Sequence, residues 1–192
     1  MTRGTLSITG DDAADDLLNT DGTALLIGML LDQQVPMEWA FRGPATIAER
    51  MEGLSPEAIA NMDVEEFVQL CKGPPAIHRF PQSMAKRVHA LAEILVEEYD
   101  GDGANVWADV EDAKELKKRL AALPGYGPDK VKIFTAILAK RFDITPEGWE
   151  KVAAPFDDET PRSAADIDSQ EVLSEVRMWK KAQKAKGKSK KD

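Results

Sequence analysis

The chain of 192 residues has a single cysteine, Cys71, and only two histidines, His78 and His89. One cysteine can form neither an intrachain disulfide nor a cysteine-ligated cluster or zinc site. No apolar run is long enough to span a bilayer, and the N-terminus lacks the apolar region of a signal peptide. We therefore expect a soluble, cytoplasmic protein that needs no metal or cofactor and does not associate with membranes.

Positive charge is also scarce, because 25 Lys and Arg face 34 Asp and Glu and give a net charge of −9. This balance argues against strong, diffuse nucleic-acid binding, which needs clustered cations. Residues 180–192 nevertheless hold seven lysines and one aspartate, a net charge of +6, which leaves −15 on residues 1–179. We expect this tail to be disordered and to add only weak electrostatic attraction to an anionic partner. A second group of cations is expected to form a local basic patch: Lys117, Lys118, Arg119, Lys130, Lys132, Lys140 and Arg141.

The sequence lacks any stretch in which apolar residues alternate with polar ones, so no strands are expected. Apolar residues recur instead at helical spacing, and the fold class is predicted to be all-α. The expected helices cover residues 9–19, 23–32, 36–51, 55–61, 64–71, 83–99, 112–123, 128–142 and 169–185. We expect a helical domain over residues 1–143 and a segment, residues 144–179, that packs on it.

The most informative stretch joins two of these helices and reads Leu123-Pro124-Gly125-Tyr126-Gly127-Pro128. Two glycines this close together let the backbone turn sharply and approach a ligand. The following helix presents N–H groups and the positive end of its dipole at the turn, which suits an anion. Pro128 fits the first helical position, where its missing N–H costs nothing. The pattern predicts a helix-hairpin-helix whose turn can hold one phosphate of a nucleic-acid backbone.

At this point the order of segments resembles the helix-hairpin-helix superfamily of base-excision DNA repair proteins, which includes endonuclease III-type and alkylpurine-type DNA glycosylases. The resemblance covers residues 23–142. It is carried by Leu30-Leu31-Asp32-Gln33-Gln34, by the segment up to Lys86 after a Gly-rich loop, and by the hairpin. It implies an HhH-GPD-type helical domain with a small extra lobe, built here from the N-terminal helix and the C-terminal segment.

The resemblance also implies which residues bind DNA. Gln34, with Gln33 beside it, matches the position of a glutamine that fills the gap left by an extruded base. Gly125, Tyr126 and Gly127 match the hairpin that holds a DNA phosphate, and Lys130 lies in the helix that follows. The residues alone leave a plainer interpretation open, in which the glycines form a structural turn and the glutamines are ordinary polar residues at a helix end.

The catalytic positions of the family match less closely. Bifunctional members carry a lysine two residues after the second hairpin glycine, where this chain has Asp129. Lys130 comes one residue later, which turns its side chain about 100° around the helix, so lyase chemistry is not expected. Family members also use an aspartate beyond the second hairpin helix, and the candidates for this role are Glu150, Glu147 and Asp143, followed by Asp157 and Asp158. The four-cysteine iron–sulfur cluster of many relatives cannot form here.

Three functions follow as hypotheses. The first is a monofunctional DNA glycosylase that cleaves the N-glycosidic bond of a damaged base in double-stranded DNA. The second is a DNA-binding protein that keeps the hairpin and the glutamine but has no activity. The third is a helical interaction module without DNA binding, consistent with the acidic body. The damaged base and any protein partner are not indicated by the sequence.

Overall fold

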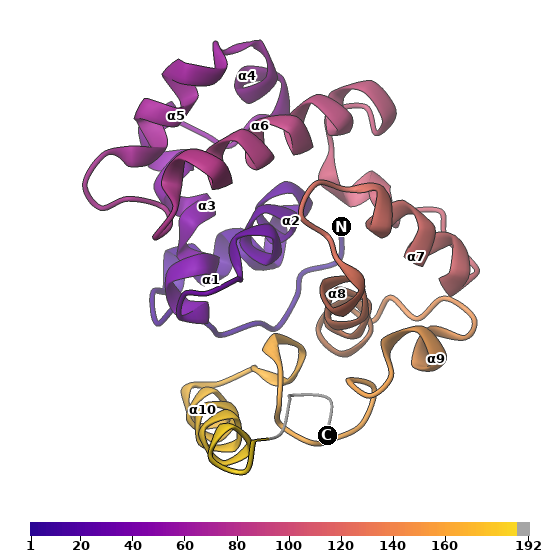
Figure 1. Cartoon of the computed structure of the whole chain (residues 1–192). Coiled ribbons are helices and arrows are strands. Elements are labelled where there is room, and N and C mark those ends of the chain that lie inside the picture. Colours follow the sequence, from indigo (N-terminus) through magenta and orange to yellow (C-terminus); the bar gives the residue numbers. More distant parts are fainter. Residues whose placement is uncertain (188–192) are drawn as a thin grey trace.

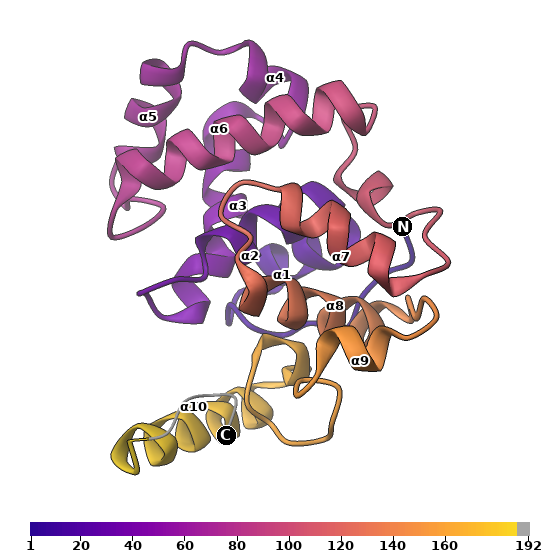
Figure 2. The same cartoon turned by 45° about the vertical axis from the view of Figure 1, so that its right-hand side comes forward.

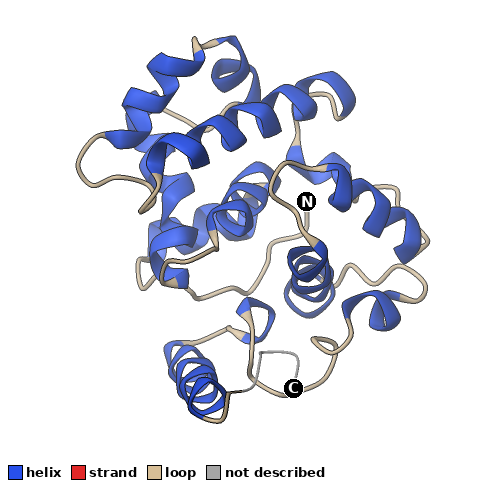
Figure 3. Cartoon of the chain, viewed as in Figure 1, coloured by secondary structure: helices blue, strands red, loops and turns tan. Residues whose placement is uncertain are grey.

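The computed structural model describes residues 1–187, and within them the chain folds entirely into helices and loops (Figure 3). No strand occurs in this range, only an isolated bridge between Asp112 and Glu147. The predicted all-α class is confirmed. The α-helices are α1 (Asp12–Thr20), α2 (Gly22–Leu31), α3 (Met37–Met51), α4 (Pro56–Asn61), α5 (Val64–Lys72), α6 (Pro81–Glu98), α7 (Ala113–Ala122), α8 (Pro128–Phe142), α9 (Trp149–Ala153) and α10 (Gln170–Ala185), with short 3-10 helices η1 (Gly103–Val106) and η2 (Ala164–Asp166).

Side-chain caps explain why most of these helices begin where they do. Asp11 accepts a hydrogen bond from the backbone N–H of Ala14 at 3.0 Å, and Ser55 accepts one from Ala58 at 3.1 Å. The same arrangement opens α2, α5, α7 and α10. Each cap satisfies a backbone donor that the helix itself leaves unpaired. The helix α8 is different, because its cap residue is Gly127, which has no side chain.

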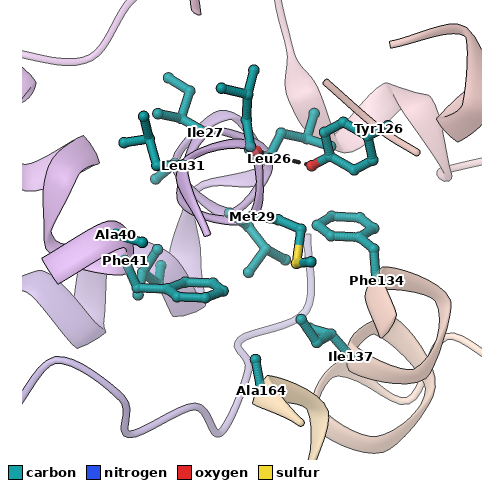
Figure 4. Close-up of a cluster of buried hydrophobic side chains, with 14 of the residues drawn as sticks. Leu26, Ile27, Met29, Leu31, Ala40, Phe41, Tyr126, Phe134, Ile137 and Ala164 are labelled. Carbon is teal, nitrogen blue, oxygen red and sulfur yellow. Dashed lines mark hydrogen bonds between the residues drawn. The ribbon is translucent and has the colours of Figure 1, made fainter. Parts of the chain in front are cut away.

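The helix α2 forms the centre of the molecule, with α4, α5 and α6 toward one end and α9 and α10 toward the other (Figures 1 and 2). All ten of its residues are buried, because α1, α3, α6, α8 and η1 all pack on it. In Figure 4, Phe41 lies on one side of α2, while Tyr126 and Phe134 lie on the other. The near-uniform apolar sequence of this helix thus reflects burial on every face.

The C-terminal segment shares the core of the domain. Ala153, Phe156, Ile167, Leu173 and Val176 are all buried in the same cluster as the residues of α2 and α8. The extended N-terminus runs alongside this segment: the N–H of Ser7 donates to the carbonyl of Ile167 at 3.3 Å, and the N–H of Thr5 donates to that of Arg141 at 3.2 Å. Residues 5–7 therefore lie between the end of α8 and the segment around Ile167.

Two details differ from the sequence prediction. The helix α9 was not expected, because five residues between Gly148 and the Pro155 turn are too few to show helical periodicity. The helix α10 continues to Ala185, as the helical spacing predicts, so the expected disorder of the tail is wrong for residues 180–185. The rest of the predicted tail, residues 188–192, lies outside the described residues. None of the helices in residues 1–187 combines the length and apolarity that a membrane crossing requires.

Candidate nucleic-acid interface

The connection between α7 and α8 forms the predicted hairpin. The N–H of Tyr126 donates to the carbonyl of Leu123 at 3.2 Å, which closes the turn. Gly125 adopts a φ of 78°, in the left-handed region that disfavours residues with a Cβ. Packing is not the reason for this glycine, since a Cβ there would meet Leu30 at 3.5 Å and Arg87 at 3.7 Å, which are ordinary contacts. The turn itself therefore requires Gly125.

Gly127 has neither a conformational nor a packing requirement within the protein. Its φ of −72° is open to any residue, and a Cβ added there would have nothing within 4 Å. The position nevertheless caps α8, where other helices of this chain use Asp or Ser. A glycine here leaves open space in front of the first turn of α8, where N–H groups and the helix dipole favour an anion.

The hairpin packs directly against α2. The hydroxyl of Tyr126 donates to the carbonyl of Leu26 at 2.9 Å (Figure 4), and the ring meets Phe134 edge-on at 5.7 Å between centroids. Tyr126 is 5% exposed, so its side chain fixes the hairpin from inside and only its backbone is available to a ligand. The ammonium group of Lys130 donates to the carbonyl of Leu30 in the last turn of α2. Lys130 thus binds the helix end that carries the glutamines.

The predicted glutamine segment is the loop between α2 and α3. Gln33 is half-buried, and its side-chain amide donates to the sulfur of Met84 at 3.1 Å. Gln34 is exposed at a φ of 57°, a left-handed conformation that is uncommon for a residue other than glycine. Backbone strain of this kind at an exposed side chain is typical of binding sites. The structure therefore brings the glutamines and the hairpin together at the C-terminal end of α2.

His78 connects the glutamine loop to the segment before α6 through two hydrogen bonds. One ring nitrogen, Nδ1, accepts a hydrogen bond from the N–H of Phe80 at 2.9 Å, so the other, Nε2, carries the proton and donates to the carbonyl of Gln33 at 2.9 Å. The ring is 1% exposed. Burial, together with the positive charge of Lys130, lowers the pKa of His78 and outweighs the opposite effect of its backbone hydrogen bonds.

Phe80 is a residue that the sequence reasoning missed. It is 44% exposed, directly follows the His78–Arg79 pair, and lies under the guanidinium group of Arg79 at 5.2 Å. His78 joins its backbone to that of Gln33, so Phe80 and the glutamine loop are neighbours. The signal in the sequence was the mixture of basic and aromatic residues in a loop, His78-Arg79-Phe80-Pro81. An exposed aromatic ring in the segment joined to the glutamine loop suits stacking on a base.

The predicted basic patch is largely absent. Lys130 binds Leu30, Lys132 donates to the carbonyl of Ala154 at 2.7 Å, and Lys140 pairs with Asp166 at 2.7 Å. Arg119 and Arg141 pair with Glu115 and Asp168. These five cations therefore hold the protein together. Lys117 and Lys118 are exposed on α7, where Lys118 also pairs with Glu115 at 3.9 Å. Spacing along the chain could not distinguish the two uses of a cation.

Two of the three predicted carboxylates lie far from the hairpin. Glu147 pairs through its backbone with Glu111 and Ala113 at 2.7 and 3.0 Å, beside the start of α7, whereas the hairpin follows the end of that ten-residue helix, about 15 Å away. Asp143 closes the opposite end of α8, about 22 Å from the hairpin, with a φ of 57°. Its role there is to end the helix.

Glu150 and Asp129 are placed differently. Glu150 is exposed on the first turn of α9, and the chain reaches the first turns of α8 four residues later, where Lys132 binds the carbonyl of Ala154. Asp129 lies on the first turn of α8 beside Gly127 and is half-buried. It shares a helix face with Lys132, three positions on, so it points toward the C-terminal segment. Asp129 is the carboxylate that the hairpin itself carries.

Other chemistry finds little support in the described residues. Cys71 is fully buried, and this burial raises the pKa of its thiol to about 12, which makes a reactive thiolate implausible. Within residues 1–187 no three His, Cys, Asp or Glu side chains gather as a metal site would require. The candidate site therefore consists of the open first turn of α8 and the exposed side chains Gln34 and Phe80.

Comparison with known proteins identifies the family. No curated protein matches the chain. Among solved structures it is similar to a trapped endonuclease III–DNA covalent intermediate, the estranged-adenine complex, with 15% identity and a TM-score of 0.46 over 88% of this chain and 81% of the other. The model of the HhH-GPD superfamily of base excision DNA repair proteins matches residues 27–191. The chain therefore belongs to the HhH-GPD superfamily of base excision DNA repair proteins.

Proposed function

We propose that this protein is a monofunctional DNA glycosylase acting on a damaged base in double-stranded DNA. The observation that carries the proposal is the meeting of the hairpin and the glutamine loop on the last turns of α2, held by the Tyr126–Leu26 and Lys130–Leu30 hydrogen bonds. A phosphate-binding turn and an exposed side chain at fixed separation are what an enzyme needs to hold a backbone while a base is displaced.

In this proposal the hairpin binds one phosphate through backbone N–H groups in front of Gly127. Gln34 enters the base stack from the α2–α3 loop, and Phe80 stacks beside it from the segment before α6. Extruding a base costs a few kcal/mol, and least for a damaged or mismatched pair, which favours such pairs. His78 keeps the two wedge residues at a constant separation, because it binds the backbone of both segments.

The proposed chemistry is hydrolysis of the N-glycosidic bond. The base leaves with the bonding electron pair, water adds its oxygen to the sugar carbon, and the protons of that water are shared between the new hydroxyl and the departing base. A carboxylate stabilises the positive charge that develops on the sugar or orients the water. We assign this role first to Asp129, because it lies at the hairpin, and second to Glu150. No lysine occupies the Asp129 position, so no Schiff base is proposed.

The superfamily's iron–sulfur cluster does not fit this chain, because four thiolate ligands are needed and only Cys71 is present, buried in the core. The proposed reaction therefore uses no such cluster. We propose the cytoplasm as the place where the protein acts.

The test is single-turnover release of free base from duplexes that carry alkylated, oxidised or deaminated bases. We expect release from at least one lesion, a loss of about 100-fold or more in Asp129→Asn, and no loss in Asp143→Asn, the control at the far end of α8. Borohydride should trap no covalent complex with the wild-type protein. Absence of base release from every lesion at saturating enzyme would contradict the proposal.

A second function, DNA binding without catalysis, is favoured by the distance of Glu147 and Asp143 from the hairpin. It predicts preference for an abasic-site analogue over intact duplex, with no product from any lesion. The same lesion panel separates the two functions.

A further inference from the structure

The helix α10 carries a stripe of positive charge on its exposed face. Arg177, Lys181 and Lys184 are spaced by four and three residues, which places them on one side of a helix. All three are exposed. The first half of the same helix carries Glu171 and Glu175 instead, so the positive charge is confined to the second half.

The second half of α10 is fixed beside the glutamine loop. The guanidinium group of Arg177 pairs with Glu38 in the first turn of α3, four residues after Gln34. The ammonium group of Lys180 donates to the sulfur of Met37 at 3.2 Å, in the same turn. The middle of α10 therefore contacts the first turn of α3, which begins three residues after the exposed Gln34.

The rest of α10 is anchored as well, so the stripe has a defined position. Leu173 and Val176 are buried in the core, and the ring of Trp179 stacks under the guanidinium group of Arg162 at 5.5 Å. The side chain of Gln170 donates to the carbonyl of Ser7 at 3.3 Å. Contacts from its first turn to Lys180 hold this helix against α3 and η2.

We propose that the Lys181–Lys184 face of α10 binds backbone phosphates of duplex DNA beside the nucleotide that Gln34 displaces. The body of the protein is strongly acidic, and six of the seven cations expected at the hairpin are bound to protein groups. Lys181 and Lys184 are exposed on α10 and can add to the phosphate neutralisation that DNA binding needs. They lie on the helix that contacts the first turn of α3, directly after the glutamine loop. This inference rests on the proposed function only in taking duplex DNA as the partner, and it does not require that the protein is catalytically active.

The experiment compares two double variants of equal charge change. Lys181→Gln/Lys184→Gln removes the two lysines of the stripe and keeps Arg177, which is paired with Glu38. Lys114→Gln/Lys151→Gln removes two exposed lysines at the start of α7 and in α9. Gln and Lys have similar helix propensities, so α10 should persist, which circular dichroism verifies. Affinity for a duplex with an abasic-site analogue is measured over a series of salt concentrations.

Each phosphate contact contributes about 0.9 to the slope of log affinity against log salt, so the α10 variant should lose about 1.8 and the control nothing. The loss should be equal on undamaged duplex, because phosphate contacts carry no information about the base. An unchanged slope, or an equal loss in the control, would overturn the proposal, as would a wild-type protein that binds no duplex. Base release is measured separately, so a protein that binds through α10 without releasing a base would contradict the glycosylase function alone.

Discussion

The hydroxyl of Tyr126 donates to the carbonyl of Leu26 across 100 residues of sequence, at 2.9 Å. This bond joins the hairpin turn, the proposed phosphate site, to the helix that leads into the glutamine loop. Because the side chain is buried, the hairpin and the glutamine loop move as one unit. The position of the hairpin relative to the glutamine loop is therefore set by contacts in the core and not by contacts at the surface.

Tyr126→Phe removes this bond and keeps the ring. We expect a loss of ~1 kcal/mol in the free energy of unfolding, the typical net value of one hydrogen bond. Chemical denaturation measures this loss. If the bond also orients the hairpin, discrimination between abasic and intact duplex should fall while the affinity for intact duplex changes little. Equal stability of the two proteins would show that the bond contributes nothing.

Replacing Gly127 by Asp tests the anion site without harming the fold. Asp is a preferred N-cap and already caps α1, α2, α5 and α7, so the variant should be at least as stable as the wild type. Its carboxylate would occupy the open space and repel phosphate, so duplex affinity should fall at least tenfold at low salt. The matched variant Gly125→Ala should instead lose about 1–2 kcal/mol of stability, because of its φ of 78°. If Gly127→Asp bound DNA as tightly as the wild type, this turn would be excluded as the phosphate-binding site.

We expect that substitutions of Gln34 can raise the stability of the protein while they lower its preference for an abasic-site analogue. Gln34→Gly relieves the left-handed backbone and should stabilise the protein by about 1 kcal/mol. The same change removes the wedge, so the preference for an abasic-site analogue should decline. Gln34→Ala serves as the control, because it removes the wedge but keeps the strained backbone. A preference that survives in both variants would assign the wedge role elsewhere, to Phe80 first.

His78 predicts how stability depends on pH. Its pKa is lowered in the folded protein, so protonation favours the unfolded chain. The stabilisation of the folded protein by neutral His78 is complete above the ordinary histidine pKa of about 6.5. It declines as the pH falls from that value toward the lower pKa of the folded protein. Between pH 7 and 5.5 the wild type should lose more stability than His78→Gln, which does not titrate. Thermal melts of both proteins across this range measure the difference, and parallel curves would contradict the assignment.

Much of the fold could be predicted from the residues alone. The apolar run of α2, the Ser and Asp caps and the hairpin glycines are local signals, because they depend on helical periodicity and on backbone conformation. The hairpin glycines Gly125 and Gly127 came from these local signals, whereas Gln33 and Gln34 came from the resemblance to the superfamily. The helix α9 was not predicted, because its five residues are too few to show a periodic pattern.

Sequence by itself determined the all-α class, most helix boundaries, the hairpin and the exclusion of a cysteine-bound cluster, because each depends on residue type or on near neighbours. Only the tertiary structure decided how individual charges are used. Lys130, Lys132 and Lys140 look like a DNA-binding group in the sequence, yet each binds a carbonyl or carboxylate of its own chain. Glu147 and Asp143 are near the hairpin by count but lie at the far ends of α7 and α8. Partners of this kind depend on distances between elements, which no local pattern encodes.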